Sequence, residues 1–300
     1  MFDIYLYGMI LKTNSFRLKH FTKPDDYQEI EEYYVLTGGE TGTCATVLAS
    51  LGCNVKMDGN FAGVNTYPLF QSFYGERGVD ISSMHYDENY DGLEDFVLIS
   101  EDTRSPLGMF EKFYSSSEKR WNVPKAEDIA GSRVAGIDPY FGNESESAAA
   151  LCLEHKIPYV TIDCASDSYM SRHAAVNIIS KEFLKFSGQI DIDEDTIFKK
   201  YTDTADGLII FTHGSRPIWY GRKGEARKEM PAYKIEPIST LGAGDTFKAG
   251  IIYALFQGMD DDSLVRFAAG CSAVACTKFP LPLYPPKLDE VMALIQNTAQ

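Results

Sequence analysis

The segment STLGAGDTFKAG, residues 239–250, places a glycine-rich turn and a carboxylate at the start of an expected helix. Gly242 and Gly244 lack a Cβ, so the turn can present successive backbone N–H groups, including that of Ala243, to an anion. The helix that follows adds its positive N-terminal end. Asp245 stands at the mouth of this turn, where it can accept a proton from a hydroxyl while the N–H groups stabilise a phosphoryl group in transfer. A glycine turn with an aspartate helix cap fits the same residues, so both interpretations stay open here.

Three segments together resemble the ribokinase-like (PfkB) family of carbohydrate and nucleoside kinases. The GAGD turn resembles the C-terminal signature of that family. Residues 37–52, TGGETGTCATVLASLG, resemble its di-glycine substrate motif and the small-residue helix that follows. Residues 207–215, GLIIFTHGS, resemble the buried strand and Thr-x-Gly turn that contact ATP phosphates. Because the order and spacing of all three match over nearly the whole chain, the sequence is identified as a member of this family.

The resemblance implies a role for each matching position, with ATP and Mg²⁺ as cofactors. Asp245 corresponds to the catalytic base, and the turn Gly242, Ala243 and Gly244 corresponds to the anion hole. Substrate-binding roles are implied at Gly38, Gly39, Thr43, Thr13 and Arg104, and ATP-binding roles at Thr212, Gly214, Ser180 and Ser272. Other interpretations fit some of these residues: Gly38 and Gly39 also suit a plain strand-to-helix turn, and Arg104 can be a solvated arginine on a hairpin. The small residues around Ser272 also permit close helix packing.

Several positions depart from the family pattern. Thr13 lies near the place where relatives carry an aspartate that holds sugar hydroxyls, and Thr43 lies where the di-glycine motif is commonly followed by asparagine. Residues 180–183, SKEF, correspond to an Asn-x-x-Glu motif that helps organise Mg²⁺ and phosphates. Ser239 stands where many members carry an aspartate associated with a monovalent cation, and Pro217 where a glycine is more usual. The acceptor, the placement of Mg²⁺ and any potassium dependence therefore stay open.

Apolar strand-like runs alternate with helical stretches along the chain, which favours a mostly parallel sheet covered on both faces. We therefore expect an α/β fold, a three-layer Rossmann-like arrangement, in a single domain over residues 1–300. The expected strands are 4–8, 134–137, 159–162, 175–179 and 208–211, and the expected helices are 41–51, 145–155, 246–257 and 262–276.

Segments 12–36 and 94–114 break this rhythm, and the second alternates apolar and polar residues. As in the resembling family, we expect them to form strands of a small β lid; a pair of edge hairpins is the alternative. Their aromatic side chains suit either a homodimer interface through the lid or closure over the substrate. These aromatics are Phe16, Phe21, Tyr27, Tyr33, Tyr34, Phe96, Phe110, Phe113 and Tyr114.

Composition limits the classes of partner. The net charge of −15 leaves no basic stripe for a nucleic-acid backbone, so we expect no nucleic-acid partner. No segment is long and apolar enough to suggest a membrane span, and residues 1–8 look like a first strand, not a signal peptide. The six cysteines lack Cys-x-x-Cys spacing and the five histidines lack metal-ligand spacing, so we expect free thiols, no protein metal site and a cytoplasmic location.

These observations predict an ATP-dependent kinase that transfers the γ-phosphoryl group to a hydroxyl of a sugar or sugar derivative, with Mg²⁺ neutralising phosphate charge. A nucleoside kinase of the same fold is the first alternative. A non-catalytic sugar- or nucleotide-binding relative is the second, favoured by the altered substrate and metal positions and opposed by the retained Asp245.

Overall fold

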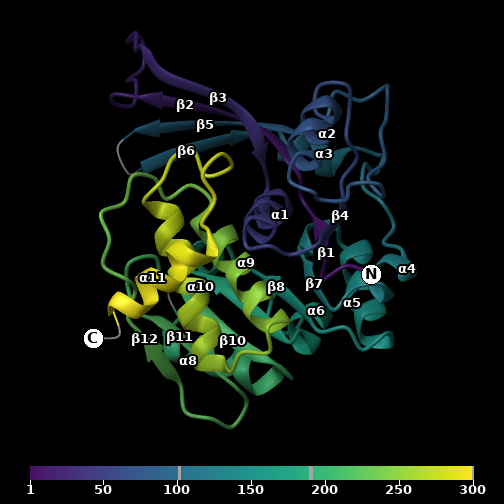
Figure 1. The fold of residues 1–300 in the computed structure, drawn as a ribbon, viewed down its shortest axis with the longest axis vertical. Coiled ribbons are helices and arrows are strands. Elements are labelled where there is room, and N and C mark those ends of the chain that lie inside the picture. Colours follow the sequence, from purple (N-terminus) through teal and green to yellow (C-terminus); the bar gives the residue numbers. More distant parts are fainter. Residues whose placement is uncertain (101–102, 189–191, 299–300) are drawn as a thin grey trace.

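The computed structural model describes residues 1–100, 103–188 and 192–298 as an α/β protein with helices on both faces of a mostly parallel sheet (Figure 1). Neighbouring strands from β4 to β10 run parallel, whereas β10, β11 and β12 pair antiparallel at one edge. In spatial order the strands are β12 (Lys228–Met230), β11 (Ile218–Gly221), β10 (Leu208–Thr212), β9 (Val176–Ser180), β8 (Tyr159–Ile162), β7 (Val134–Ile137), β1 (Ile4–Gly8) and β4 (Val55–Gly59).

Strand β1 shows why these short apolar runs form a central sheet. Its side chains alternate between faces, so Ile4 and Leu6 pack into one core while Tyr5 and Tyr7 pack into another. All four are buried because helices cover both faces. The continuous apolar run in the sequence is therefore the signature of a strand with no solvent-facing side.

Helices α1, α9, α10 and α11 contribute to the core on one face of the sheet, and α4, α5, α6 and α8 contribute to the cores on the other (Figure 1). Their arrangement places the N-terminal ends of α1 and α9 near each other, and the Cys44 thiol of α1 donates to the Asp245 carbonyl of α9 at 3.3 Å. The helices are α1 (Glu40–Ser50), α2 (Tyr67–Gly75), α3 (Phe110–Ser115), α4 (Ala126–Ala130), α5 (Asn143–Glu154), α6 (Tyr169–His173), α7 (Lys181–Phe186), α8 (Glu194–Thr204), α9 (Ala243–Phe256), α10 (Asp261–Cys276) and α11 (Leu288–Thr298), with a 3₁₀ turn at Pro139–Phe141.

A second sheet lies across one end of the molecule, beyond α1 in Figure 1. Strand β2 pairs antiparallel with β3 and parallel with β5, and β5 pairs antiparallel with β6. The register sets residue 13 beside residue 95 and residue 16 beside residue 98. In order, its strands are β3 (Ile30–Gly38), β2 (Leu11–Leu18), β5 (Glu94–Ser100) and β6 (Thr103–Gly108).

The predicted α/β fold class is confirmed, with boundaries moved by a few residues. Strand β9 begins one residue later than expected, and β10 continues to Thr212. Strand character over 110–114 is wrong: these residues belong to α3, because Phe110, Phe113 and Tyr114 recur at helical spacing and Phe113 is buried. The other strands of the two inserted segments form the second sheet, whereas its action as a lid and the single-domain description stay predictions.

All six cysteines are free, and five of them are buried. No helix in the described ranges has both the length and the apolar character that crossing a bilayer requires.

Candidate active site

A cavity of about 390 Å³ lies between the second sheet and the N-terminal ends of α1 and α9. We call its two sides the helix wall and the strand wall. The helix wall contains Gly39, Glu40, Thr43, Gly242 and Asp245. The strand wall contains Leu11, Thr13, Ser15, Gly38, Asp95 and Val97. Aromatic and apolar side chains complete the lining: Phe110, Tyr114, Tyr140, Phe279 and Leu281 are among them.

The glycine turn forms the N-terminus of α9. Gly242 is its N-cap with φ 77, a left-handed conformation that favours glycine, and the Thr246 N–H closes the first turn on the Gly242 carbonyl at 2.9 Å. No side-chain hydrogen bond caps this end of the helix. A Cβ on Gly244 would meet no atom within 4 Å. The space beside Gly244 is therefore open, as an anion site next to the first-turn N–H groups requires.

Asp245, in the first turn of α9, lines the cavity beside these N–H groups. Burial raises its pKa to about 6, and the nearby Asp138 carboxylate adds to the rise. Lys248 and then Arg104 act in the opposite direction, while Asp163 raises the pKa slightly further. A carboxylate with a pKa near 6 is ionised at neutral pH and is a stronger base than an exposed aspartate.

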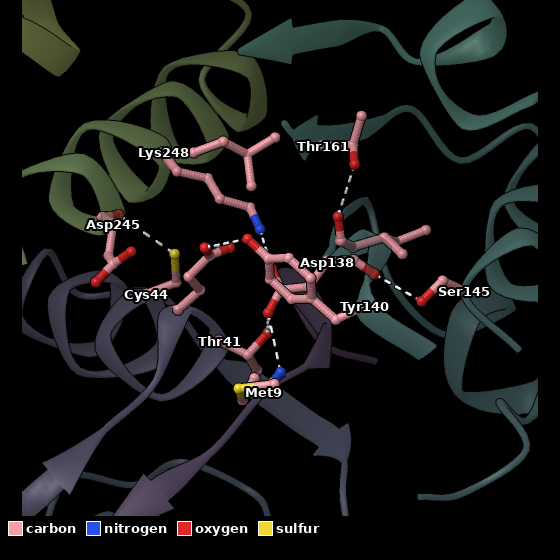
Figure 2. A network of polar contacts seen from close by, with 12 residues as sticks. Met9, Thr41, Cys44, Asp138, Tyr140, Ser145, Thr161, Asp245 and Lys248 are labelled. Atoms are coloured by element: carbon pink, nitrogen blue, oxygen red, sulfur yellow. Dashed lines mark hydrogen bonds and ion pairs between the residues drawn. The ribbon is translucent and has the colours of Figure 1, made fainter. Parts of the chain in front are cut away.

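A buried ion pair between Lys248 and Asp138 lies behind Asp245 (Figure 2). Lys248 is 1% exposed and Asp138 is not exposed. Asp138 Oδ2 also accepts hydrogen bonds from the Thr41 hydroxyl at 2.8 Å and from the Met9 N–H at 2.9 Å. The Asp138 carboxylate therefore ties α9, α1 and the end of β1 together below the cavity.

Glu40 is held next to this network. The Tyr140 hydroxyl donates to Glu40 Oε1 at 2.5 Å. The other oxygen, Oε2, is buried without a hydrogen-bond partner among the described residues. Burial, followed by the charge of Asp138, raises the pKa of Glu40 well above its ordinary value. Nothing in the sequence singled out Glu40 beyond its place directly after the di-glycine motif.

The di-glycine motif and Thr13 fit together closely. A Cβ on Gly38 would overlap the Thr13 hydroxyl, and a Cβ on Gly39, which has φ 82, would overlap the Met9 carbonyl. Both glycines are therefore required by local packing while their backbones also line the cavity. Thr43 lines the cavity from α1. The structure brings these acceptor-binding candidates together with Asp245.

Arg104 lies outside the cavity lining. Its guanidinium donates to the Thr240 carbonyl at 3.1 Å and to the Thr240 hydroxyl at 3.0 Å. Strand β6 is thereby connected to the loop that leads into the glycine turn. The arginine also lowers the pKa of Asp245, so it is close enough to influence the base electrostatically.

Three of the four ATP-binding candidates lie at the carboxyl-terminal edge of the main sheet, separate from the cavity lining. Thr212 and Ser180 are the last residues of β10 and β9 and pair in register. The Ser180 hydroxyl donates to Asp163 Oδ2 at 2.9 Å and accepts from the Phe183 N–H at 3.1 Å, so it caps α7. Gly214 follows with φ 67, a turn conformation that suits glycine.

Ser272, the fourth ATP-binding candidate, lies on α10. Its hydroxyl donates to the Ala243 carbonyl at 3.0 Å, so α10 supports the glycine turn from behind. Ser239 lies at the start of the loop before the turn and accepts from the Leu241 N–H at 3.3 Å. The hydroxyl groups of Ser272 and Ser239 therefore stabilise the conformation of the glycine turn.

The pfkB family of carbohydrate kinases has a sequence profile that matches residues 2–281. The chain belongs to this family. A ribokinase of Haemophilus influenzae is 20% identical over 301 residues, which cover 97% of each protein.

Solved structures described as ribokinases share this fold. One, from Agrobacterium tumefaciens and presumed to be a ribokinase, has a TM-score of 0.86 at 17% identity and covers 99% of this chain and 98% of its own. Another, the Arabidopsis thaliana ribokinase complexed with ribose and ATP, has a TM-score of 0.78 at 14% identity and covers 98% of each chain. At these identities the likeness establishes the fold alone.

Within this pfkB family fold, the structure supplies acidic groups that sequence reasoning missed. Asp95 lines the cavity next to Thr13, so a carboxylate from β5 enters the cavity beside that uncharged residue. Asp163 follows β8 directly, has φ 53 and accepts hydrogen bonds from Ser180. Burial raises the pKa of both carboxyl groups to about 6. A carboxylate that directly follows a buried strand was the available signal for Asp163.

Lys248 was also missed, although its spacing offered a signal. It follows Asp245 by three residues, which places the two on neighbouring positions of one helix face. The surrounding residues of α9 are apolar and buried, so a lysine there must find a buried partner. Asp138, which follows β7, is that partner.

Proposed function

We propose that this protein transfers the γ-phosphoryl group of ATP to a hydroxyl of a sugar or sugar derivative. Asp245 is the general base, and the Gly242–Asp245 turn is the anion hole. The observation that carries the proposal is the position of the Asp245 carboxylate, which lines the acceptor cavity at the uncapped N-terminus of α9. A base and a set of N–H donors then meet at one point, as in-line phosphoryl transfer needs.

In the proposed reaction, the acceptor hydroxyl lies against Asp245 with Gly38, Gly39 and Thr43 around the rest of the molecule. The ionised carboxylate takes the hydroxyl proton as the oxygen attacks the γ-phosphorus and the bond to the β-phosphate oxygen breaks. The N–H groups of the turn stabilise the charge on the transferring group. Because the pKa of Asp245 is about 6, the base form dominates at neutral pH.

ATP would bind along the edge formed by Thr212, Gly214 and Ser180, with Ser272 supporting the turn. No group of three His, Cys, Asp or Glu side chains within the described ranges is arranged to hold a metal ion. Mg²⁺ commonly keeps its waters and binds phosphates with one or two carboxylates, so Asp163 and the neighbouring Glu182 fit such a role. When bound, Mg²⁺ would neutralise phosphate charge.

The test is ADP release from Mg-ATP across neutral sugars, amino sugars, sugar phosphates, sugar acids and nucleosides, with and without potassium. Turnover with one acceptor that is lost in Asp245→Asn would support the proposal and name the acceptor class. ATP binding without acceptor-dependent turnover would favour a non-catalytic binding protein instead.

A nucleoside acceptor is a second candidate, and the aromatic lining favours it. Phe110, Tyr114, Tyr140 and Phe279 all line the cavity, and aromatic side chains stack well on nucleobases. The nucleosides in the panel decide between the two acceptor classes.

We also propose that the second sheet closes over the acceptor as a lid and mediates a homodimer in the cytoplasm. Leu11, Thr13 and Ser15 of β2 face the cavity, whereas Phe16 stacks on Tyr33 with ring centroids 4.9 Å apart on the other face. The inner face thus supports closure, and the exposed aromatic outer face supports contact with a second copy. Six free thiols are the observation that favours a reducing compartment.

A further inference from the structure

Asp95 is the second residue of β5 and the one carboxylate that this strand directs into the cavity. The register sets it beside Thr13 of β2, whose side chain also lines the cavity. The preceding residue, Glu94, is engaged elsewhere: its carboxylate accepts from Lys12 Nζ at 3.1 Å and from Asn14 Nδ2 at 3.2 Å. The two neighbouring carboxylates of β5 therefore differ, because Glu94 is paired outside the cavity and Asp95 lines it.

The Asp95 carboxyl group is incompletely satisfied by the protein. Its Oδ1 atom is buried and has no hydrogen-bond partner among the described residues. Burial raises its pKa to about 6, against the effect of hydrogen bonding from Thr13. A buried carboxylate oxygen without a donor is unfavourable, and such groups are normally paired in native proteins. A ligand donor in the cavity would remove this cost.

The charges around the cavity define which ligand can supply that donor. Glu40, Asp95 and Asp245 line it, and the described lining residues include no lysine, arginine or histidine. The nearby cations lie outside the lining: Lys248 pairs with Asp138, and Arg104 bonds to the uncharged Thr240 and keeps its positive charge. A phosphate or carboxylate on the acceptor would meet like charge with no cation in the lining, whereas a hydroxyl or ammonium group would meet an acceptor oxygen.

We propose that Asp95 is a specificity-determining residue that accepts a hydrogen bond from a hydroxyl or ammonium group of the acceptor. The cavity then selects polyhydroxylated acceptors that are uncharged or carry an amine, and rejects sugar phosphates and sugar acids. This inference rests on the proposed kinase activity, because it names the acceptor class of the same site. Asp95 acts at the end of the acceptor that faces the second sheet, across the cavity from the base.

The experiment compares matched acceptors: ribose with ribose 5-phosphate, and glucose with glucosamine, gluconate and glucose 6-phosphate. For the wild-type enzyme, kcat/KM for the anionic members is expected to be about 10²-fold or more below that of their uncharged or amino counterparts. For Asp95→Asn, KM for the best acceptor is expected to rise about 10- to 100-fold, with kcat changed by less than about threefold. If Asp95→Asn raises KM more for glucosamine than for glucose, the donor to Asp95 is an ammonium group. Equal rises in KM for the two sugars assign a hydroxyl.

Glu94→Gln is the matched control, because it makes the same carboxylate-to-amide change on the adjacent residue of β5, away from the cavity. It should leave KM unchanged. Melting temperature and ADP binding of Asp95→Asn should match or exceed those of the wild type, whereas a purely structural residue would lower the melting temperature. KM within about twofold of the wild type in Asp95→Asn, or preference for an anionic acceptor, would overturn the inference. Turnover retained in Asp245→Asn would instead remove the proposed function itself.

Discussion

The helix wall and the strand wall of the cavity are built from the sequence in different ways. The helix wall takes its chemistry from the N-terminal turns of α1 and α9, where glycines and a carboxylate are adjacent along the chain. The strand wall takes its polar groups from neighbouring strands, so that Thr13 and Asp95 meet only through the parallel register of β2 and β5. Local sequence encodes the first wall, and tertiary pairing encodes the second.

This difference also separates the expected roles of the two walls. A helix N-terminus offers fixed N–H donors and suits the common step, which is phosphoryl transfer. A strand face offers side chains that can change one at a time without disturbing the ladder hydrogen bonds, and it suits the choice of acceptor. Substitutions on the helix wall are therefore expected to lower kcat, and substitutions on the strand wall to raise KM.

The largest effect is expected for Asp245→Asn. Loss of the base is expected to lower kcat by about 10²- to 10⁴-fold, while the isosteric amide keeps the fold intact. Steady-state kinetics with the best acceptor, together with the melting temperature, measure both outcomes. Asp289→Asn makes the same change in the first turn of α11 and should leave kcat unchanged. Wild-type turnover in Asp245→Asn would contradict a chemical role for the helix wall.

The two glycines of the turn should respond differently to alanine. Gly244→Ala adds a methyl group to open space beside the N–H donors, so we expect kcat to fall about 10²-fold. Its stability should rise by about 0.5–1 kcal/mol, since alanine is the better helix former.

Gly242→Ala is the contrasting variant. It places a side chain at φ 77 and 2.9 Å from Leu281 Cδ2, so we expect a loss of roughly 1–2 kcal/mol in the free energy of unfolding. Denaturant unfolding and kcat, measured on both variants, test the distinction. Equal loss of stability in the two would contradict the view that Gly244 borders an anion site.

The pH dependence of the helix wall depends on the buried pair below it. The proposed base Asp245 acts in its ionised form and its pKa is about 6, so kcat should fall about tenfold per pH unit as the pH drops below 6. Lys248 lowers this pKa and Asp138 raises it. Lys248→Met removes the lowering charge, so the acid limb of the kcat profile should move to higher pH.

Lys248→Met also leaves Asp138 buried and unpaired, which should cost about 3–5 kcal/mol of stability. The double variant Lys248→Met, Asp138→Asn removes both charges and is the control. It should recover most of the stability and return the acid limb toward that of the wild type. If the acid limb of the kcat profile stays at the wild-type pH in both variants, the Lys248–Asp138 pair affects stability but not the pKa of Asp245.

The fold class and every helix-wall residue except Glu40 could be named from the sequence, whereas on the strand wall only Thr13 and Gly38 could. Apolar runs such as that of β1 are buried on both faces, so their composition alone identifies them. The GAGD turn is local, so a role for Asp245 could be proposed from the sequence. Asp95, by contrast, follows Glu94 in an ordinary strand, and only the register with β2 shows which of the two carboxylates enters the cavity. Glu40 and the pair Lys248–Asp138 depend on tertiary contacts in the same way.

The smallest effect on chemistry is expected on the outer face of the strand wall. Phe16 stacks on Tyr33 and Phe96, with ring centroids 4.9 and 6.4 Å away, and Tyr33 is 54% exposed. Aromatic side chains gathered on an exposed sheet face are typical of interfaces between proteins. A second copy of the chain, meeting this face through the same residues by two-fold symmetry, would bury them.

Light scattering at micromolar concentration should therefore show a dimer for the wild type and a monomer for Tyr33→Ser combined with Phe96→Ser. Because Thr13 and Asp95 lie on the opposite face of the sheet, KM and kcat of the double variant should stay within about twofold of the wild type if the sheet folds and closes without its partner. A monomeric wild type would contradict the proposed dimer interface. Dimer loss accompanied by a large rise in KM would instead show that the second copy holds the strand wall in place, which would make association part of acceptor recognition.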